Sequence, residues 1–334
     1  MEWLPKFFKA STSRKFNLLF SMNYRPLTPT LPKVSAIGLG TWQLGINSGW
    51  KSMTEKKAIA LVRHALEQGV NFFDTAPNYG LGTSEERLGK ALKGFDRSKL
   101  VINTKFGHSH TGQFNFRSDA IRSSLEGSLK RLGTDYVDSL ILHNPPMEFL
   151  DGNKTDHYEV LEKLVEEGKI KAYGASVDTP HEMRLLLNTT NSKVVEAFFN
   201  ILHQEVSSAF DLVQEKQAGV IAKIPLDSGW LSGKYHENST FEGVRSRWTR
   251  EDIKTRARLV EQVKRILQTG DELPQKAIAF CLGYDAVSTV IPGCGSIDQL
   301  KQNLRSLEKP LTLEEIHKLE AFYEQEVMAL KLPW

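Results

Sequence analysis

The sequence predicts a protein of the α/β class, a single-domain (β/α)8 TIM barrel, and three observations predict it. Short apolar runs alternate along the chain with amphipathic helical patterns, which gives eight strand–helix units. The length of 334 residues suits one large barrel as a single domain. No Gly-x-Gly-x-x-Gly sequence follows the first expected strand, so an open dinucleotide-binding sheet is not supported.

The expected strands are β-branched or otherwise apolar runs separated by helical patterns. They are Val34–Leu39, Val70–Asp74, Leu100–Thr104, Val137–Leu142, Ile170–Ser176, Val194–Asn200, Val220–Ile224 and Ser288–Ile291. Helix signals lie between them. Thr179 followed by Pro180 is typical of a helix start, and Gly133 is typical of a helix end.

Segments outside this pattern complete the expected domain organisation. Residues 24–33 contain three prolines and are expected to form a hairpin that plugs the bottom of the barrel, and helices are expected at the C-terminus. Residues 1–21 carry four basic residues and one acidic residue. We interpret them as a leader outside the fold, either a disordered tail or sequence upstream of a true start at Met22. A weak amphipathic targeting segment is the alternative. Residues 22–334 are the expected barrel domain.

Composition and charge exclude several classes of protein. The net charge of +3 comes from residues 1–21, so the rest of the chain is neutral and does not attract nucleic acid or anionic membranes. No apolar run approaches the 18 or so residues of a membrane-spanning helix. The two cysteines cannot form a disulfide framework, which indicates a reducing compartment and a cytoplasmic protein. The long non-periodic stretch 226–250 is expected to be a functional loop.

Polar side chains stand at the ends of three consecutive expected strands, and they are Asp74, Lys105 and His143. Carboxyl ends of barrel strands meet at one face, so these groups can converge, and Tyr79 in the loop after Asp74 can reach them. A nearby ammonium is expected to lower the pKa of a phenol, and Asp74 is the partner that keeps Lys105 charged. His143 can orient a carbonyl oxygen or relay a proton. The set predicts proton delivery to a carbonyl oxygen, with the hydride supplied by a cofactor.

Several segments together resemble the aldo-keto reductases. They are GLGTWQLG at 38–45, DTAPNYG at 74–80, TKFG at 104–107, LH at 142–143, GASV at 174–177 and IPG at 291–293. The resemblance covers residues 22–307 in family order. It implies a (β/α)8 barrel, an NADP or NAD cofactor, and reversible reduction of aldehydes or ketones to alcohols. By these matches Tyr79 would donate the proton, Asp74 and Lys105 would tune it, and His143 would orient the substrate.

The resemblance also implies a cofactor site on the later strands. Ser176 matches a serine that contacts the nicotinamide carboxamide, whereas Glu196 and Lys223 stand where the family commonly has Gln and a stacking Tyr. Lys223 is instead expected to pair with Glu196. The other expected contacts are Thr41, Trp42, Asp74, Pro225, Leu226, Ser228, Leu231, Gly233, Lys234, Pro292, Gly293, Gly295, Ser296, Gln299 and Asn303. Residues 291–300 contain no Lys or Arg, which weakens an NADP preference and leaves NAD or dual use open.

A small carbonyl compound or alcohol is the expected substrate, and sugar aldehydes or lactols are included because the sequence is similar to the sugar branch of the family. The side chains expected around it are Trp42, Trp50, Tyr79, Phe106, His143, Asn144 and Trp230. A regulatory subunit with little turnover, similar to channel-associated family members, is one alternative. A barrel lyase or isomerase that uses Lys105 as a Schiff base is another. His108 and His110 lack further ligands at metal spacing, so no metal is expected. Monomer and homo-oligomer both stay open.

Overall fold

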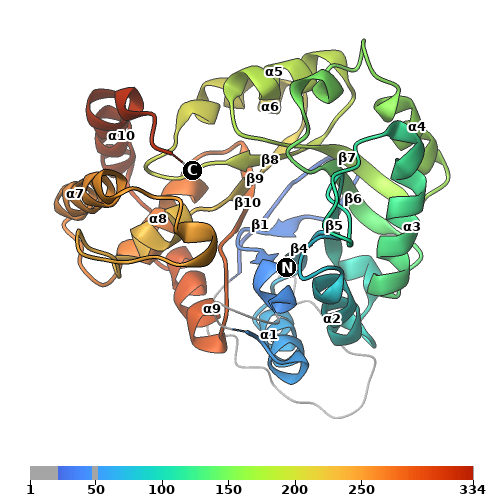
Figure 1. Ribbon diagram of the computed structural model, residues 1–334, viewed down its shortest axis with the longest axis horizontal. Coiled ribbons are helices and arrows are strands. Elements are labelled where there is room, and N and C mark those ends of the chain that lie inside the picture. Colours follow the sequence, from blue (N-terminus) through green and yellow to red (C-terminus); the bar gives the residue numbers. More distant parts are fainter. Residues whose placement is uncertain (1–21, 47–51, 334) are drawn as a thin grey trace, which may run out of the picture.

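Eight parallel strands form a nearly closed barrel within residues 22–46 and 52–333, the part of the chain described by the computed structural model (Figure 1). In barrel order the strands are β3 (Leu39–Gly40), β4 (Phe72–Asp74), β5 (Val101–Phe106), β6 (Val137–Leu142), β7 (Ile170–Val177), β8 (Val194–Phe198), β9 (Gly219–Lys223) and β10 (Val287–Ile291). Bridges from Ile37 to Val290 and from Gly40 to Gly293 connect the two ends of the sheet. The expected (β/α)8 barrel is confirmed.

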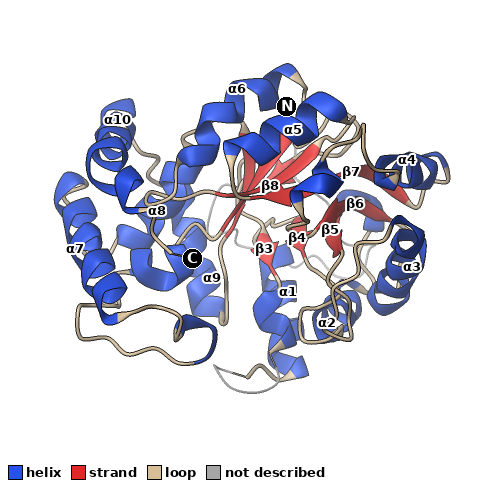
Figure 2. Ribbon diagram, turned by 45° about the horizontal axis from the view of Figure 1, so that its top comes forward, coloured by secondary structure: helices blue, strands red, loops and turns tan. Residues whose placement is uncertain are grey.

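Helices surround the strands (Figure 2). They are α1 (Glu55–Glu67), α2 (Thr83–Leu92), α3 (Ile121–Leu132), α4 (His157–Glu166), α5 (Pro180–Thr189), α6 (Phe210–Glu215), α7 (Arg250–Ile266), α8 (Leu273–Leu282), α9 (Ile297–Leu304) and α10 (Leu313–Phe322). The helix start expected at Thr179 and the helix end expected at Gly133 are confirmed. Thr179 forms a capping box with Glu182 at the start of α5, and Gly133 ends α3 with a φ of 66°. Helix α10 packs against α7 beyond the last barrel strand.

A two-stranded hairpin covers the amino-terminal end of the barrel. It pairs β1 (Tyr24–Arg25) with β2 (Val34–Ser35). Its apolar side chains cluster with buried side chains of the barrel strands, and the cluster consists of Leu27, Leu31, Val34, Phe72, Val101, Ile141, Ala172, Val194, Ile221 and Ile291. The expected first strand over residues 34–39 is wrong, because the amide of Ala36 donates to Asn23 whereas that of Gly38 donates to Val290. The chain leaves the hairpin and enters the barrel within that run.

The alternation of side chains along β5 positions the site. Lys105 is buried inside the barrel among polar groups, whereas Phe106 points outward and packs against Phe116 and His157. Successive side chains of a strand face opposite sides, so a strand of a barrel needs apolar residues outside and can place a polar one inside. The polar residues at the carboxyl ends of the strands are therefore buried and close to one another.

Glycine at position 174 permits close packing of β7 against β8. A Cβ there would lie 1.7 Å from the carbonyl oxygen of Val194, its register partner. We expect Gly174→Ala to lower the free energy of unfolding by about 1–3 kcal/mol, because the strands must separate to accept the methyl group. Urea denaturation measures this. The control is Gly270→Ala, where a Cβ meets no atom within 4 Å; equal losses in both variants would contradict the packing argument.

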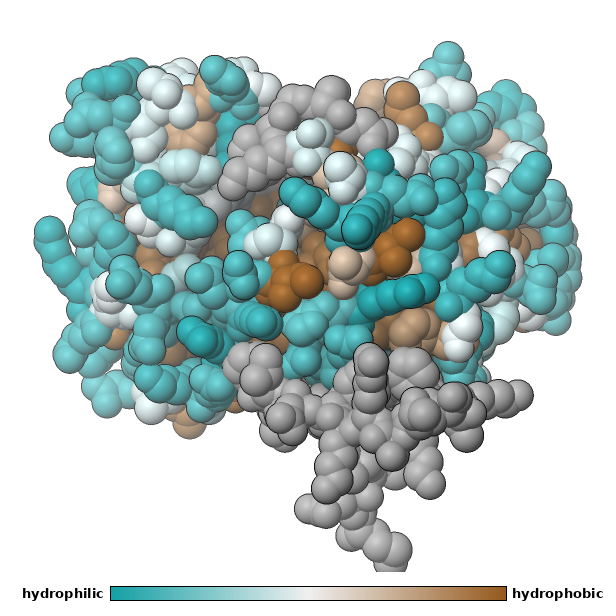
Figure 3. Space-filling view, turned by 90° about the horizontal axis from the view of Figure 1, so that it is seen from below, coloured by the Kyte–Doolittle hydropathy of each residue, from teal (hydrophilic) through white to brown (hydrophobic). Residues whose placement is uncertain are grey.

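No helix of the described residues is long and apolar enough to cross a membrane. Figure 3 shows one face of the molecule, on which hydrophilic side chains predominate and apolar side chains gather only in small groups. The largest apolar side chains with high exposure include Trp42, Leu81, Phe114 and Met147. All four follow the carboxyl ends of strands β3 to β6, so they lie on loops at the mouth of the barrel.

Candidate active site

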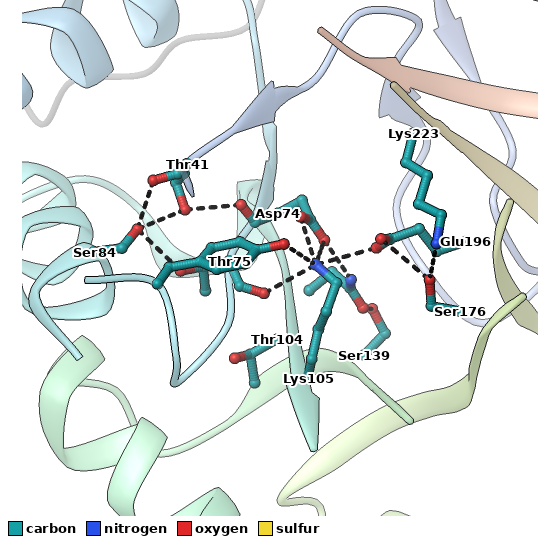
Figure 4. A network of polar contacts seen from close by, with 12 residues as sticks. Thr41, Asp74, Thr75, Ser84, Thr104, Lys105, Ser139, Ser176, Glu196 and Lys223 are labelled. Carbon is teal, nitrogen blue, oxygen red and sulfur yellow. Dashed lines mark hydrogen bonds and ion pairs between the residues drawn. The ribbon is translucent and has the colours of Figure 1, made fainter. Parts of the chain in front are cut away.

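A buried lysine, Lys105 on β5, is the centre of the site (Figure 4). Its Nζ donates to both carboxylate oxygens of Asp74 at 2.6 Å and to the carbonyl oxygen of Thr75 at 3.2 Å. It also donates to the hydroxyl of Tyr79 at 3.3 Å. Since the lysine donates to the phenol oxygen, the hydrogen of Tyr79 is left to point elsewhere. The structure thus brings Asp74, Tyr79 and Lys105 together, as expected from their places at the strand ends.

Asp74 is oriented from two neighbouring strands. Asn103 Nδ2 donates to Asp74 Oδ2 at 2.7 Å, and Ser139 Oγ on β6 donates to Asn103 Oδ1 at 2.6 Å. Thr41 donates to the backbone carbonyl of Asp74 at 2.8 Å. Asn103 was not singled out from the sequence. The signal was available, because Asn103 precedes Lys105 by two residues on one strand and so shares its inward face.

A second carboxylate, Glu196 on β8, also contacts Lys105, with Oε2 at 3.1 Å from Nζ. Its expected pairing with Lys223 is wrong. Lys223 instead lies 2.8 Å from Asp178 Oδ1 and donates at 2.8 Å to Ser176 Oγ. The strand register explains the difference, because Glu196 is paired with Ile221, so Lys223 lies two residues nearer the mouth.

Burial and charge set the protonation of these groups. Burial raises the pKa of Tyr79, and Lys105 opposes this only in part, so the expected net lowering of that pKa is wrong. Burial, followed by the charge of Glu196, raises the pKa of Asp74 to about 7 against the opposing ammonium. Burial lowers the pKa of Lys105, but Asp74 and Glu196 outweigh it and raise that pKa above its usual range. At neutral pH the site holds a phenol and an ammonium.

His143 follows β6 and faces Tyr79, with the two rings edge to face and their centroids 5.9 Å apart. Burial and the charge of Lys105 hold the pKa of His143 well below its usual range, so the imidazole is neutral. A neutral ring orients a substrate oxygen by one hydrogen bond, which fits the expected orienting role better than a protonated relay. His108 stacks on His143 with centroids 4.2 Å apart, a contact that sequence reasoning missed.

Asn144 follows His143 in a left-handed backbone conformation, with a φ of 46°. Its Oδ1 accepts hydrogen bonds from Lys223 at 2.8 Å and from Ser176 at 2.9 Å, and its amide donates to Asp178 at 2.8 Å. Asn tolerates this backbone region better than most residues. Lys223, Ser176, Asn144 and Asp178 therefore form a polar group beside the catalytic candidates.

Two expected substrate contacts are corrected by the structure. Phe106 is 2% exposed and faces the outer helices, not the mouth. Trp230 has no exposed surface and packs its ring against Tyr235 and Trp248, so it does not face the mouth. Trp42 is exposed at the mouth, and Trp50 lies outside the described residues, as does the leader 1–21.

The loop after β9 has backbone geometry suited to an anion. Ser228 and Gly229 have φ values of 53° and 101°. Arg247 Nη2 donates to Ser228 Oγ at 3.5 Å, and the guanidinium of Arg245 lies so close that a Cβ on Gly229 would be 3.4 Å from it. These arginines were missed from the sequence, although both stand in the long stretch 226–250. Of the other expected residues of this loop, Leu231 is buried and Lys234 is exposed.

The segment after β10 is the expected adenosine end. Ser296 caps α9 by accepting from the amide of Gln299, whose side chain in turn accepts from the amide of Gly295 at 2.7 Å. Asn303 is 5% exposed, and its Nδ2 lacks a hydrogen-bond partner among the described residues. A helix N-terminus, an unpaired buried amide and the two arginines of the loop after β9 suit the phosphates and polar edges of a dinucleotide.

Comparisons with known proteins agree with this arrangement. A model of the Aldo/keto reductase family matches residues 36–324. The chain is similar to L-galactose dehydrogenase from Arabidopsis thaliana, with 30% identity over 311 residues that cover 90% of this chain and 94% of the relative. It is 28% identical over 303 residues to NADH-specific methylglyoxal reductase from Escherichia coli, covering 84% and 92%. The holo form of aldo-keto reductase AKR11C1 from Bacillus halodurans matches with a TM-score of 0.77 and 29% identity, covering 90% and 96%.

The barrel, together with these matches, defines an NAD(P)-dependent oxidoreductase that acts on carbonyl groups. The chain belongs to the aldo/keto reductase family.

Proposed function

We propose that the protein reduces the aldehyde group of a sugar or a similarly small polar compound with NAD(P)H, and that Tyr79 delivers the proton to the carbonyl oxygen. One observation carries the proposal: Lys105 donates a hydrogen bond to the Tyr79 oxygen while Asp74 holds the ammonium in place. The ammonium stabilises the negative charge that the phenol oxygen acquires when it gives up its proton.

The other residues position the reactants. His143 would donate one hydrogen bond to the carbonyl oxygen, next to Tyr79. The loop with Ser228 and Arg247 would hold the pyrophosphate of the cofactor, and Ser176 the carboxamide. The cofactor, when bound, supplies the hydride. The loop after β9 contains Pro225, Leu226 and Gly233, and the segment after β10 contains Pro292 and Gly293; these five residues are proposed as backbone or packing contacts of the cofactor.

The mouth supports a substrate with both polar and apolar faces. Asn144 and Asp178 present hydrogen-bonding groups beside the site. Exposed Trp42 and Phe114 offer apolar surface, of the kind that packs against the C–H faces of a sugar ring. The similarity to L-galactose dehydrogenase, which covers nearly the whole chain, favours the sugar class.

The Schiff-base alternative is disfavoured by the charge of Lys105. A nucleophilic amine must be deprotonated, whereas Asp74 and Glu196 raise the pKa of this lysine. Borohydride treatment with an aldose is expected to leave Lys105 unmodified in a peptide mass spectrum. Both cysteines are buried and free, which agrees with the proposed action in the reducing cytoplasm.

The direct test is the absorbance of reduced nicotinamide on mixing the protein with a panel of aldoses and simple aldehydes. We expect consumption of NADH or NADPH with at least one aldose. Consumption with apolar aldehydes alone would contradict the sugar class, and no consumption with any member of the panel would contradict the activity.

We expect Arg247→Ala to weaken the binding of both NADH and NADPH by about tenfold or more, because one charge-assisted hydrogen bond to a phosphate contributes about 1.5–3 kcal/mol. Quenching of tryptophan fluorescence measures the dissociation constants. Arg117→Ala, which removes an exposed guanidinium paired with Asp119, is the matched control. Equal affinities of Arg247→Ala and the unchanged protein would contradict the proposal that this loop binds the cofactor. The ratio of the NADH and NADPH dissociation constants of the unchanged protein gives its cofactor preference.

A further inference from the structure

The ion cluster inside the barrel has more carboxylates than its ammonium balances. Lys105 Nζ lies 2.6 Å from Asp74 and 3.1 Å from Glu196, and all three side chains are at most 4% exposed. Two buried carboxylates beside one buried ammonium leave one negative charge uncompensated, which is costly in a medium of low dielectric constant. Uptake of a single proton by the carboxylate pair removes that cost.

The neighbouring groups do not supply the missing positive charge. The imidazoles of His143 and His108, on the loops after β6 and β5, have lowered pKa values through burial and are neutral. Lys223 on β9 is paired at 2.8 Å with Asp178, which follows β7. Tyr79 is a neutral phenol. Among the described residues that face the pair, every cation other than Lys105 is thus already matched.

We propose that Asp74 and Glu196 share one proton around Lys105, and that this pair resupplies the proton that Tyr79 gives to the substrate. The second half rests on the proposed function, whereas the first half does not. As the Tyr79 proton passes to the carbonyl oxygen, the phenol oxygen takes a proton from the Lys105 ammonium. The lysine nitrogen then takes the proton of the carboxyl pair, and the pair is left as two carboxylates.

A chain of polar contacts runs from Glu196 through Ser176 to Lys223 (Figure 4) and on to the partly exposed Asp178. Glu196 Oε1 lies 3.4 Å from Ser176 Oγ, whose one proton can be donated either to it or to Asn144 Oδ1. Ser176 accepts from Lys223 at 2.8 Å, and Lys223 pairs with Asp178, whose side chain is 38% exposed. Glu196 is therefore the member of the pair through which a proton from the mouth of the barrel returns to the cluster.

The position of Glu196 also determines the pH at which the pair loses its proton. After burial, the charge of Glu196 is the largest cause that raises the pKa of Asp74, to about 7. Removing that charge lowers the pKa of Asp74, so a Glu196→Gln protein releases the proton at lower pH. Reduction consumes this proton, so kcat falls at high pH where the pair has lost it. In Glu196→Gln this fall in kcat is therefore expected at lower pH.

The proton itself is tested without cofactor or turnover, by infrared difference spectra of the protein across the neutral pH range. We expect a protonated-carboxyl band that disappears as the pH rises through about 7. The transition is expected to move down by about one pH unit or more in Glu196→Gln and to vanish in Asp74→Asn. Glu167→Gln, at an exposed pair with Arg122, is the control and is expected to leave it in place. A transition unmoved in Glu196→Gln overturns the shared proton.

The resupply is tested by kcat against pH in the same variants. We expect the falling limb in Glu196→Gln to shift down by the amount of the infrared transition, with kcat about tenfold lower at neutral pH. A changed NADH dissociation constant with an unmoved kcat profile would assign Glu196 to the carboxamide alone and overturn the resupply. If the unaltered protein reduces no aldehyde, the proposed function fails, while the infrared result still decides whether the proton is shared.

Discussion

Tyr79→Phe is expected to lower kcat for aldehyde reduction by a factor of about 100 to 10,000, the range typical of a lost general acid. The phenyl ring keeps the edge-to-face contact with His143 but has no proton to give. NADH affinity is expected to change by less than about twofold, because the hydroxyl is bonded to Lys105 and not to any group proposed to bind the cofactor.

The comparison that isolates this effect is Tyr136→Phe, the same substitution at a tyrosine before β6, packed between Arg97 and Lys171. We expect its kcat to equal that of the unchanged protein. Steady-state rates and fluorescence titration of both variants distinguish lost chemistry from lost binding. Full turnover in Tyr79→Phe would assign proton donation to another group, with His143 the nearest candidate.

The part of the site that follows from strand order was predictable from the sequence. Asp74, Lys105 and His143 lie at or next to the carboxyl ends of three consecutive strands, and parallel neighbours must bring these ends together. Glu196 was not placed correctly, because its contact with Lys105 crosses the barrel interior from β8 to β5. Nothing in local spacing gives a contact between strands that are not neighbours.

Other errors have separate physical causes. Phe106 was expected at the mouth, although the inward direction of Lys105 already requires its neighbour to face outward. Trp230 lies in a loop whose path depends on tertiary packing rather than on a periodic pattern. Whether the pKa of Tyr79 rises or falls depends on how the effect of burial compares with the charge of Lys105, and only the folded structure shows how deeply the phenol is buried.

The hairpin was predicted correctly, whereas the boundary between the hairpin and the first barrel strand was not. Its three prolines and its role as a plug were apparent from residues 24–33, and the pairing of β1 with β2 confirms the hairpin. Its second strand begins just beyond, at Val34, in a mostly apolar segment that also contains Leu39 of β3. The hydrophobic pattern of such a segment does not indicate the residue at which its backbone hydrogen bonds pass from the hairpin to the barrel.

Arg256→Met is expected to lower the free energy of unfolding by about 3–5 kcal/mol, because it leaves a buried carboxylate without its partner. Arg256 on α7 and Asp227 in the loop after β9 form an ion pair in which neither side chain is exposed. Burial raises the pKa of Asp227, but Arg256 and His203 together lower it below its usual value. The effect is expected to reach the loop after β9 that is proposed to hold the cofactor, because Asp227 is adjacent to Ser228.

Two further variants separate the buried charge from simple loss of packing. Arg258→Met, at an exposed position on the same helix, is expected to cost less than about 1 kcal/mol. The double variant Arg256→Met with Asp227→Asn is expected to recover part of the loss, since the amide carries no charge to bury. In Arg256→Met alone, Asp227 is expected to take up a proton more readily than in the unchanged protein. The difference in free energy of unfolding between Arg256→Met and the unchanged protein should therefore become smaller as the pH is lowered from neutrality. Urea denaturation at several pH values measures the free energy of unfolding of each variant. A difference between Arg256→Met and the unchanged protein that does not vary with pH, with no recovery in the double variant, would contradict the charge argument. It would mean that the arginine stabilises the loop by packing against Trp248.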